Sequence, residues 1–246
     1  MTTLVACSHG TADPAGAAAV TRLVEAVRRR AGLPVVEAHV DVHPPYLADV
    51  APRHRDVVVV PLLLAAGYHA HVDIARVVDD HPSAAQADAL GPDPRITALL
   101  LDRLHAARLR PDDAVVLAAA GSSDDAADVS VRRTAEALGA HLARPVTVAY
   151  GAARAPRVAD EVARLRAEQP RRRVVLASYL LATGHFHRRL LAAGADVVTA
   201  PLLDGPVVDE RLVDVVLDRY AVTARSRCTA GRRHAATRER PRSGGR

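Results

Sequence analysis

Short runs of consecutive apolar residues alternate along this chain with longer stretches whose apolar positions recur at helical spacing. Continuous apolar runs are typical of strands in a parallel sheet that is covered by helices on both faces. The runs predict strands at residues 3–7, 35–40, 57–64, 84–90, 114–119, 145–149, 173–180 and 196–200. The stretches between them predict helices at residues 14–30, 70–79, 95–109, 125–138, 155–168, 186–193 and 207–220.

Segments of the first half recur in the second half at a nearly constant distance. An apolar run that ends in Gly67 and a polar helical stretch recurs as one that ends in Gly184. Gly10 and Gly121 likewise follow matching strand-like runs. The offsets are 117 residues for the first pair and 111 for the second. Solenoid repeats have shorter periods of about 20–50 residues, so the pattern indicates a duplicated domain.

The length agrees with this interpretation, since 246 residues suit two small domains of about 100–150 residues each. An apolar content of 49% is enough for a core in each, and the 2% aromatic content means a core of Ala, Val and Leu. We therefore expect an α/β fold with two similar doubly wound lobes and mostly parallel sheets, at residues 1–110 and 111–221.

The net charge of +5 comes from segment 222–246, which holds eight arginines and one acidic residue, so residues 1–221 carry −2. This Gly/Ser/Arg-rich composition predicts a basic, disordered and dispensable tail. The tail is either solvated or in contact with RNA or a membrane surface. The acidic balance and few aromatics of the folded part argue against a nucleic-acid partner.

Cys7 and Cys228 are the only cysteines, and they provide no disulfide framework. No apolar run reaches the roughly 18 residues of a membrane span, and no signal peptide is recognisable. We therefore expect a cytoplasmic protein without a membrane partner.

Polar residues follow three predicted strands of the first lobe. His9 follows the first strand, Asp41 and His43 follow the second, and His69 follows the third. Ligands bind outside the carboxyl ends of the strands in such sheets, and neutral imidazole binds transition metals or accepts a proton near pH 7. We expect His9 and His69 to share a metal ion. Asp41, His43 or water would complete its coordination, although a solvated loop is an equal alternative for the first two.

The two copies differ at these positions. His9 is matched by Ala120, and His69 is matched by Phe186. A duplication that kept its scaffold and lost ligand-type residues in one copy predicts a single asymmetric site between two similar lobes.

The remaining histidines are less informative. His71 should point away from His69 if a helix begins there, and His39 shows no constellation with other residues. His185 and His187 flank the phenylalanine of the second copy, facing either the lobe interface or the surface.

Three motifs together resemble the sirohydrochlorin chelatase family, the cobalt- and ferrochelatases of cobalamin and siroheme synthesis. They are residues 8–11 (SHGT), 41–45 (DVHPP) and 61–69 (PLLLAAGYH). The resemblance covers residues 1–221 and is to the long, tandem form of the family, with lobes of the class II chelatase type.

The resemblance implies that His9 and His69 bind the metal and that Asp41, where the family commonly has Glu, assists insertion. A divalent ion, Fe²⁺ or Co²⁺, would enter sirohydrochlorin as a substrate while two pyrrole protons leave, with no permanently bound cofactor. One of the histidines, or Asp41, would accept a proton as general base.

The tetrapyrrole partner is rich in carboxylates, which arginines bind by charge-assisted hydrogen bonds. The candidate substrate-binding residues are Arg76, Arg154, Arg188 and Arg189. The alternative function is a non-catalytic protein of the same fold that binds metal or tetrapyrrole for delivery. The sequence leaves the choice of metal, the pathway and the oligomeric state open, although two tandem lobes are sufficient for a complete site in a monomer.

Overall fold

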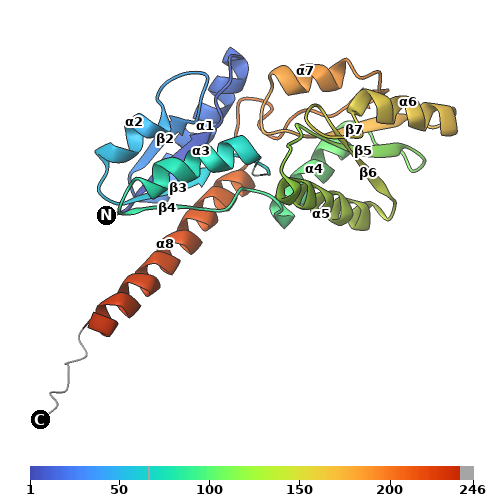
Figure 1. Cartoon of the computed structure of the whole chain (residues 1–246). Coiled ribbons are helices and arrows are strands. Elements are labelled where there is room, and N and C mark those ends of the chain that lie inside the picture. Colours follow the sequence, from blue (N-terminus) through green and yellow to red (C-terminus); the bar gives the residue numbers. More distant parts are fainter. Residues whose placement is uncertain (66, 239–246) are drawn as a thin grey trace, which may run out of the picture.

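The computed structural model describes residues 1–65 and 67–238 and contains two four-stranded parallel sheets (Figure 1). The first sheet has the order β2-β1-β3-β4 and consists of β1 (Thr3–Ser8), β2 (Val35–His39), β3 (Val57–Pro61) and β4 (Ala84–Gln86). The second has the order β6-β5-β7-β8 and consists of β5 (Ala114–Ala119), β6 (Val146–Tyr150), β7 (Val174–Tyr179) and β8 (Val197–Val198). The shared order confirms the expected pair of similar α/β lobes.

Helices follow the strands as the alternating pattern predicts. They are α1 (Pro14–Ala31), α2 (Leu47–Val50), α3 (Tyr68–Asp79), α4 (Pro94–Ala106), α5 (Asp125–Leu142), α6 (Val158–Glu168), α7 (His185–Leu191) and α8 (Glu210–Arg238). Every helix expected from the sequence is present. The pattern does not predict α2 or the 3₁₀ turn Ala51–Arg53 that follows it, because elements this short show no helical periodicity. The edge strands β4 and β8 are also shorter than the runs that predicted them.

The duplication extends to single backbone conformations. Gly10 and Gly121 have φ values of +94° and +96°. A β-carbon at either position would collide with a carbonyl oxygen, that of Asp41 in the first lobe and that of Ala152 in the second. Both turns therefore require glycine, for its left-handed conformation and for the close approach of the backbone.

The covering helices cross between the lobes. Helix α4 follows the strands of the first lobe but packs on α5 and β7, whereas α8 follows the second lobe but packs on α1, β3 and β4 (Figure 1). The expected boundary near residue 110 therefore separates the strands but not these helices. The apolar faces of both helices belong to one core that also includes strands of both sheets, and burial of those faces explains the exchange.

Two reciprocal ion pairs join the exchanged helices. Arg95 of α4 binds Asp218 of α8 at 2.6 Å, and Arg211 of α8 binds Asp102 of α4 at 2.6 Å. The two pairs are related by one offset of 116 residues. The lobes thus meet through the same surface used twice, which is the arrangement of an isologous interface within one chain.

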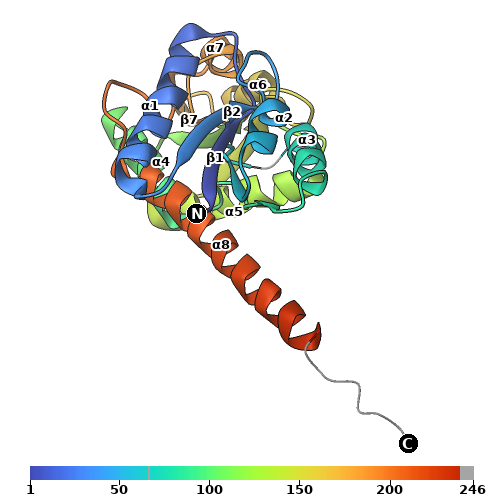
Figure 2. The same ribbon diagram turned by 90° about the vertical axis from the view of Figure 1, so that its left-hand side faces the viewer.

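The structure corrects the expectation of a disordered tail from residue 222. Helix α8 continues to Arg238 and extends beyond the lobes (Figure 2). Arg227 anchors its middle by donating a 3.0 Å hydrogen bond to the Val57 carbonyl of β3, and Ala and Arg are strong helix formers. Residues 239–246, which the same expectation includes, lie outside the described residues. Within the described part of the chain, no helix is long and apolar enough to cross a membrane.

Candidate functional site

The strand order brings the residues that follow β2, β1 and β3 to one edge of the first sheet. His9 directly follows β1, which lies between β2 and β3. Asp41 follows β2, and His69 lies in the first turn of α3. The side chains of residues 68–71 lie outside the described residues, so the imidazoles of His69 and His71 are not placed.

The backbone holds His9 in an exposed turn. The Asp41 amide donates to the His9 carbonyl at 3.0 Å, and the Val40 amide donates to the Ser8 carbonyl at 2.9 Å. His9 is exposed, whereas Ser8 before it is buried. A fixed backbone with an exposed imidazole suits a group that must meet a ligand from solution.

A buried histidine lies directly behind this turn. His39 is 4% exposed, and its Nδ1 lies 2.8 Å from the Ser8 Oγ. Burial, assisted by the nearby His43, lowers the pKa of His39 to about 4, so the ring is neutral near pH 7. The sequence pattern alone does not connect His39 with other functional residues. Its place on the second predicted strand, beside the strand that ends in the SHGT motif, is the one signal that points to it.

His43 packs against the same ring. The centroids of the His39 and His43 rings are 4.2 Å apart in an edge-to-face arrangement. The Nδ1 of His43 lies 3.0 Å from the Pro44 carbonyl, and its Nε2 is buried without a hydrogen-bond partner in the described part of the chain. His43 thus retains one ring nitrogen that can accept a proton or a metal.

The second lobe shows how the duplicated positions lie relative to one another. Ala120 and Phe186 match His9 and His69. A β-carbon built at Gly151 would lie 3.0 Å from Phe186 Cδ1 and 3.4 Å from the Ala120 carbonyl oxygen. The counterparts of the two histidines therefore approach one another beside the strand that follows α5. Because the two lobes share their topology, this geometry supports the approach of His9 and His69 in the first lobe.

In each lobe, the glycine that precedes α3 or α7 lies beside the turn after the first strand of the other lobe. A β-carbon built at Gly67 would lie 3.4 Å from Ser122 Oγ in the second lobe. Its counterpart at Gly184 would lie 3.5 Å from Thr11 Oγ1 in the first lobe. The loop that precedes α7 therefore lies beside Thr11, at the end of the turn that carries the exposed His9.

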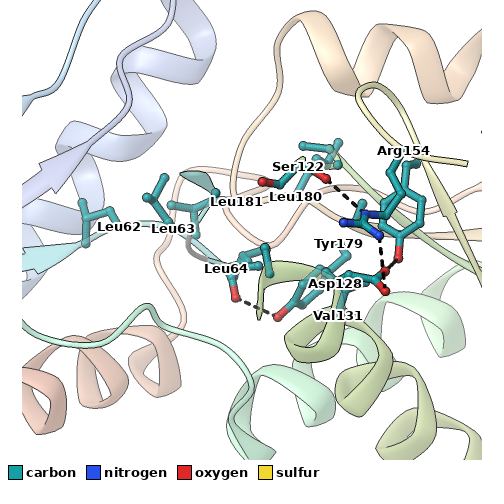
Figure 3. Close-up of a pocket in the computed structure, with 17 residues that line it drawn as sticks. Leu62, Leu63, Leu64, Ser122, Asp128, Val131, Arg154, Tyr179, Leu180 and Leu181 are labelled. Carbon is teal, nitrogen blue, oxygen red and sulfur yellow. Dashed lines mark hydrogen bonds and ion pairs between the residues drawn. The ribbon is translucent and has the colours of Figure 1, made fainter. Parts of the chain in front are cut away.

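A cavity of about 180 Å³ lies between the lobes (Figure 3). The first lobe contributes aliphatic side chains that follow β3, and the second contributes the turn after β5 together with Asp128, Tyr150 and Arg154. Tyr179 crosses from β7 to donate a 3.0 Å hydrogen bond to the Leu64 carbonyl. Burial raises the pKa of Tyr179 to about 12, so its hydroxyl remains a donor across the physiological range.

The four candidate arginines lie on three different segments: α3, the loop after β6, and α7. Arg154 lines the cavity, but its guanidinium already donates to the Ser122 carbonyl at 3.2 Å and pairs with Asp125 at 2.5 Å. Arg188 forms an ion pair with Asp13 of the first lobe. Arg76 and Arg189 are exposed on α3 and α7.

The histidines of α7 have separate surroundings. His185 is exposed, with its ring 5.4 Å from that of Phe186. His187 is partly buried, and its Nε2 lies 3.4 Å from the Thr199 carbonyl. Among the side chains that the structure describes, no three His, Cys, Asp or Glu residues form a cluster able to hold a metal.

The CbiX family model matches the chain twice, at residues 3–107 and 114–220. This chain belongs to the CbiX family. The two matches cover both lobes, which confirms the tandem resemblance seen in the sequence motifs.

Solved structures of similar fold include two SirB proteins from Bacillus subtilis. SirB from Bacillus subtilis with Fe³⁺ has a TM-score of 0.72 and 20% sequence identity, and the match covers 89% of this chain and 94% of that one. The sirohydrochlorin chelatase SirB from Bacillus subtilis subspecies spizizenii in complex with cobalt has a TM-score of 0.68 and 19% identity, covering 89% and 93%.

A third structure, described as CbiX, the terminal enzyme for biosynthesis of siroheme in denitrifying bacteria, has a TM-score of 0.62. It is 21% identical, and the match covers 88% of this chain and 98% of that one. At these identities the likeness establishes a shared fold. Comparison with curated protein sequences finds no match.

Proposed function

We propose that this CbiX-family protein is a chelatase that inserts Fe²⁺ or Co²⁺ into sirohydrochlorin, in siroheme or cobalamin biosynthesis. The observation that carries the proposal is the family match across both lobes. The structural neighbours SirB with Fe³⁺ and sirohydrochlorin chelatase SirB with cobalt support the metal-insertion chemistry.

His9 and His69 are the proposed metal ligands. Two neutral imidazoles leave most of the coordination sphere open, so the metal is held weakly enough to be passed to the macrocycle. Closed thiolate sites, by contrast, retain their metal. The exposed turn of His9 and the approach of Ala120 to Phe186 in the second lobe support this pair.

Asp41 is proposed to accept a pyrrole proton or to complete the coordination of the metal. Its amide is bonded to the His9 carbonyl, so its backbone is held beside the first ligand, and its side chain is exposed. A carboxylate at this place can serve as general base. His43, whose Nε2 has no hydrogen-bond partner among the described residues, is the second candidate for the third ligand.

The tetrapyrrole is proposed to bind between the lobes, with its edge toward the apolar cavity. Its carboxylates would pair with arginines of both α3 and α7. Arg154 can contribute only if it leaves Asp125 and Asp128, whereas Arg76 and Arg189 are exposed and need no such rearrangement.

Insertion of Fe²⁺, Co²⁺ and Ni²⁺ into sirohydrochlorin, followed by absorbance, tests the proposal. Multiple turnovers with one of these ions support a chelatase. Binding that stops at one equivalent of tetrapyrrole or metal supports the alternative, a non-catalytic delivery protein of the same fold.

A further inference from the structure

The two lobes differ in a pair of buried residues that face each other at the ends of neighbouring strands, just behind the turn that carries His9. The strand register places Ser8 opposite His39 in the first lobe and Ala119 opposite Tyr150 in the second. In the first lobe the ring bonds to the Ser8 hydroxyl at 2.8 Å. In the second lobe Ala119 has no hydroxyl, and Tyr150 instead donates its hydrogen bond to Asp128 on α5. The link to the turn thus exists only in the lobe that carries His9.

The Ser8 hydroxyl connects this ring to both sides of His9. Ser8 immediately precedes His9, and the amide of Gly10, which immediately follows it, donates to Ser8 Oγ at 3.2 Å. His39 Nε2 lies 3.8 Å from a carboxylate oxygen of Glu37. This carboxylate favours the ring proton on Nε2, which leaves Nδ1 to accept from Ser8. The Ser8 hydroxyl therefore donates to His39 Nδ1 and accepts from the Gly10 amide. Together these two hydrogen bonds fix the conformation of the turn at residues 8–10.

Glu37 is itself held in place. Thr21 of α1 donates a 3.0 Å hydrogen bond to its Oε1. The chain of contacts therefore runs from helix α1 through Glu37, His39 and Ser8 to the turn. His39 is 4% exposed, so packing fixes its ring as well as the hydrogen bond.

We infer that His39 is a positioning residue for metal binding, which acts through Ser8 to orient the turn that presents His9. The inference rests on the proposed function, because it assumes that His9 binds the metal. Residues that support metal ligands from behind typically change metal affinity by about 10–100-fold when they are removed. In the proposed arrangement, His39 contacts neither the metal nor the tetrapyrrole.

The test compares four single variants of the full chain, and the double variant of His39→Phe with Ser8→Ala, with the wild type. His39→Phe keeps an aromatic ring but removes both nitrogens, and Ser8→Ala removes the hydroxyl. His39→Asn retains an acceptor at the position of Nδ1 and is the rescue variant. Tyr150→Phe is the matched control, since it removes a buried hydrogen bond at the equivalent position of the second lobe.

The measurements are Co²⁺ affinity by absorbance titration without tetrapyrrole, KM for each substrate of insertion, and melting temperature. We expect His39→Phe and Ser8→Ala each to weaken Co²⁺ binding about tenfold and to raise KM for the metal but not for sirohydrochlorin. The double variant should be no weaker than either single one, because both remove the same contact. His39→Asn should remain within about threefold of the wild type in Co²⁺ affinity, and Tyr150→Phe should leave the Co²⁺ affinity at the wild-type value.

Three results overturn the inference: His39→Phe with wild-type Co²⁺ affinity, Tyr150→Phe with an equal loss of affinity, or a wild-type protein that binds no Co²⁺. If the wild type binds Co²⁺ but never inserts it, and His39→Phe still weakens binding, the positioning role holds and the proposed enzymatic function fails.

Discussion

Arg188 of α7 in the second lobe forms an ion pair with Asp13 of the first lobe, which caps helix α1 just after the turn that carries His9. Asp13 also accepts a 2.9 Å hydrogen bond from the Gly16 amide. That bond, followed by the contact with Arg188, holds the pKa of Asp13 below its usual value. The ion pair therefore joins the lobes at the edge of the proposed metal site.

Arg188→Ala should change substrate binding more than stability. The Arg188 side chain is 63% exposed, and exposed ion pairs contribute little to folding. We expect an unchanged melting temperature and a raised KM for sirohydrochlorin, because the second lobe is less firmly held over the His9 turn. Arg166→Ala, which removes an exposed arginine from an ion pair within the second lobe, is the comparison. An equal rise in KM for both variants would indicate a general effect of positive surface charge and not of this ion pair.

His9→Ala and His69→Ala should each abolish most metal insertion. Both residues are proposed metal ligands, and neither change removes a core side chain from the strands. Initial insertion rates measure the effect, with circular dichroism as the control for folding. His71→Ala should matter much less. Near-normal rates for both single variants would contradict a shared metal ion.

Tyr179→Phe should lower the stability of the whole molecule. The Tyr179 hydroxyl is buried, donates to the Leu64 carbonyl at 3.0 Å and lies 3.3 Å from Thr134 Oγ1. Its removal deletes a buried hydrogen bond, which costs about 0.5–1.5 kcal/mol, while the Leu64 carbonyl still accepts from the Gly91 amide at 3.1 Å. Urea denaturation measures the free energy of unfolding. Tyr46→Phe, at an exposed tyrosine, should leave it unchanged, and an equal loss there would rule out the explanation.

His39 should make folding sensitive to mild acid. Its folded-state pKa is lowered from 6.5 to about 4, so the unfolded chain binds the proton more strongly. The stability that the neutral ring provides is complete above about pH 6.5 and is lost as the pH falls toward 4. Between pH 7 and 4, the metal-free wild type should lose about 3 kcal/mol more than His39→Asn. Parallel stability curves for the two proteins would disprove this.

Two truncations of α8 should show which part of the helix contributes to stability. A chain that ends at residue 221 loses the hydrogen bond from Arg227 to Val57, worth about 1 kcal/mol, and its melting temperature should fall by about 2–4 °C. A chain that ends at residue 230 keeps that contact and should melt like the full chain. Insertion should continue in both. An unchanged melting temperature in the shorter chain would restore the sequence-based expectation that this segment is dispensable.

The alternating apolar pattern determined the order of strands and helices, because continuous apolar runs and helical periodicity are local properties. The internal duplication could also be recognised in the sequence, because two copies of one fold keep their turn glycines, as Gly10 and Gly121 show. The position of His9 at the carboxyl end of the first strand followed from the same pattern. These features need no knowledge of which segments meet in space.

Only the tertiary structure decided the rest. Ser8 and His39 are 31 residues apart in the sequence. Their contact depends on the register between two strands, which no local sequence pattern predicts. The exchange of α4 and α8 depends on which apolar surface remains uncovered once both sheets have formed, and the extension of α8 depends on an anchor at Val57. In each case the deciding energy comes from partners distant in sequence, so the residues themselves carry no local sign of it.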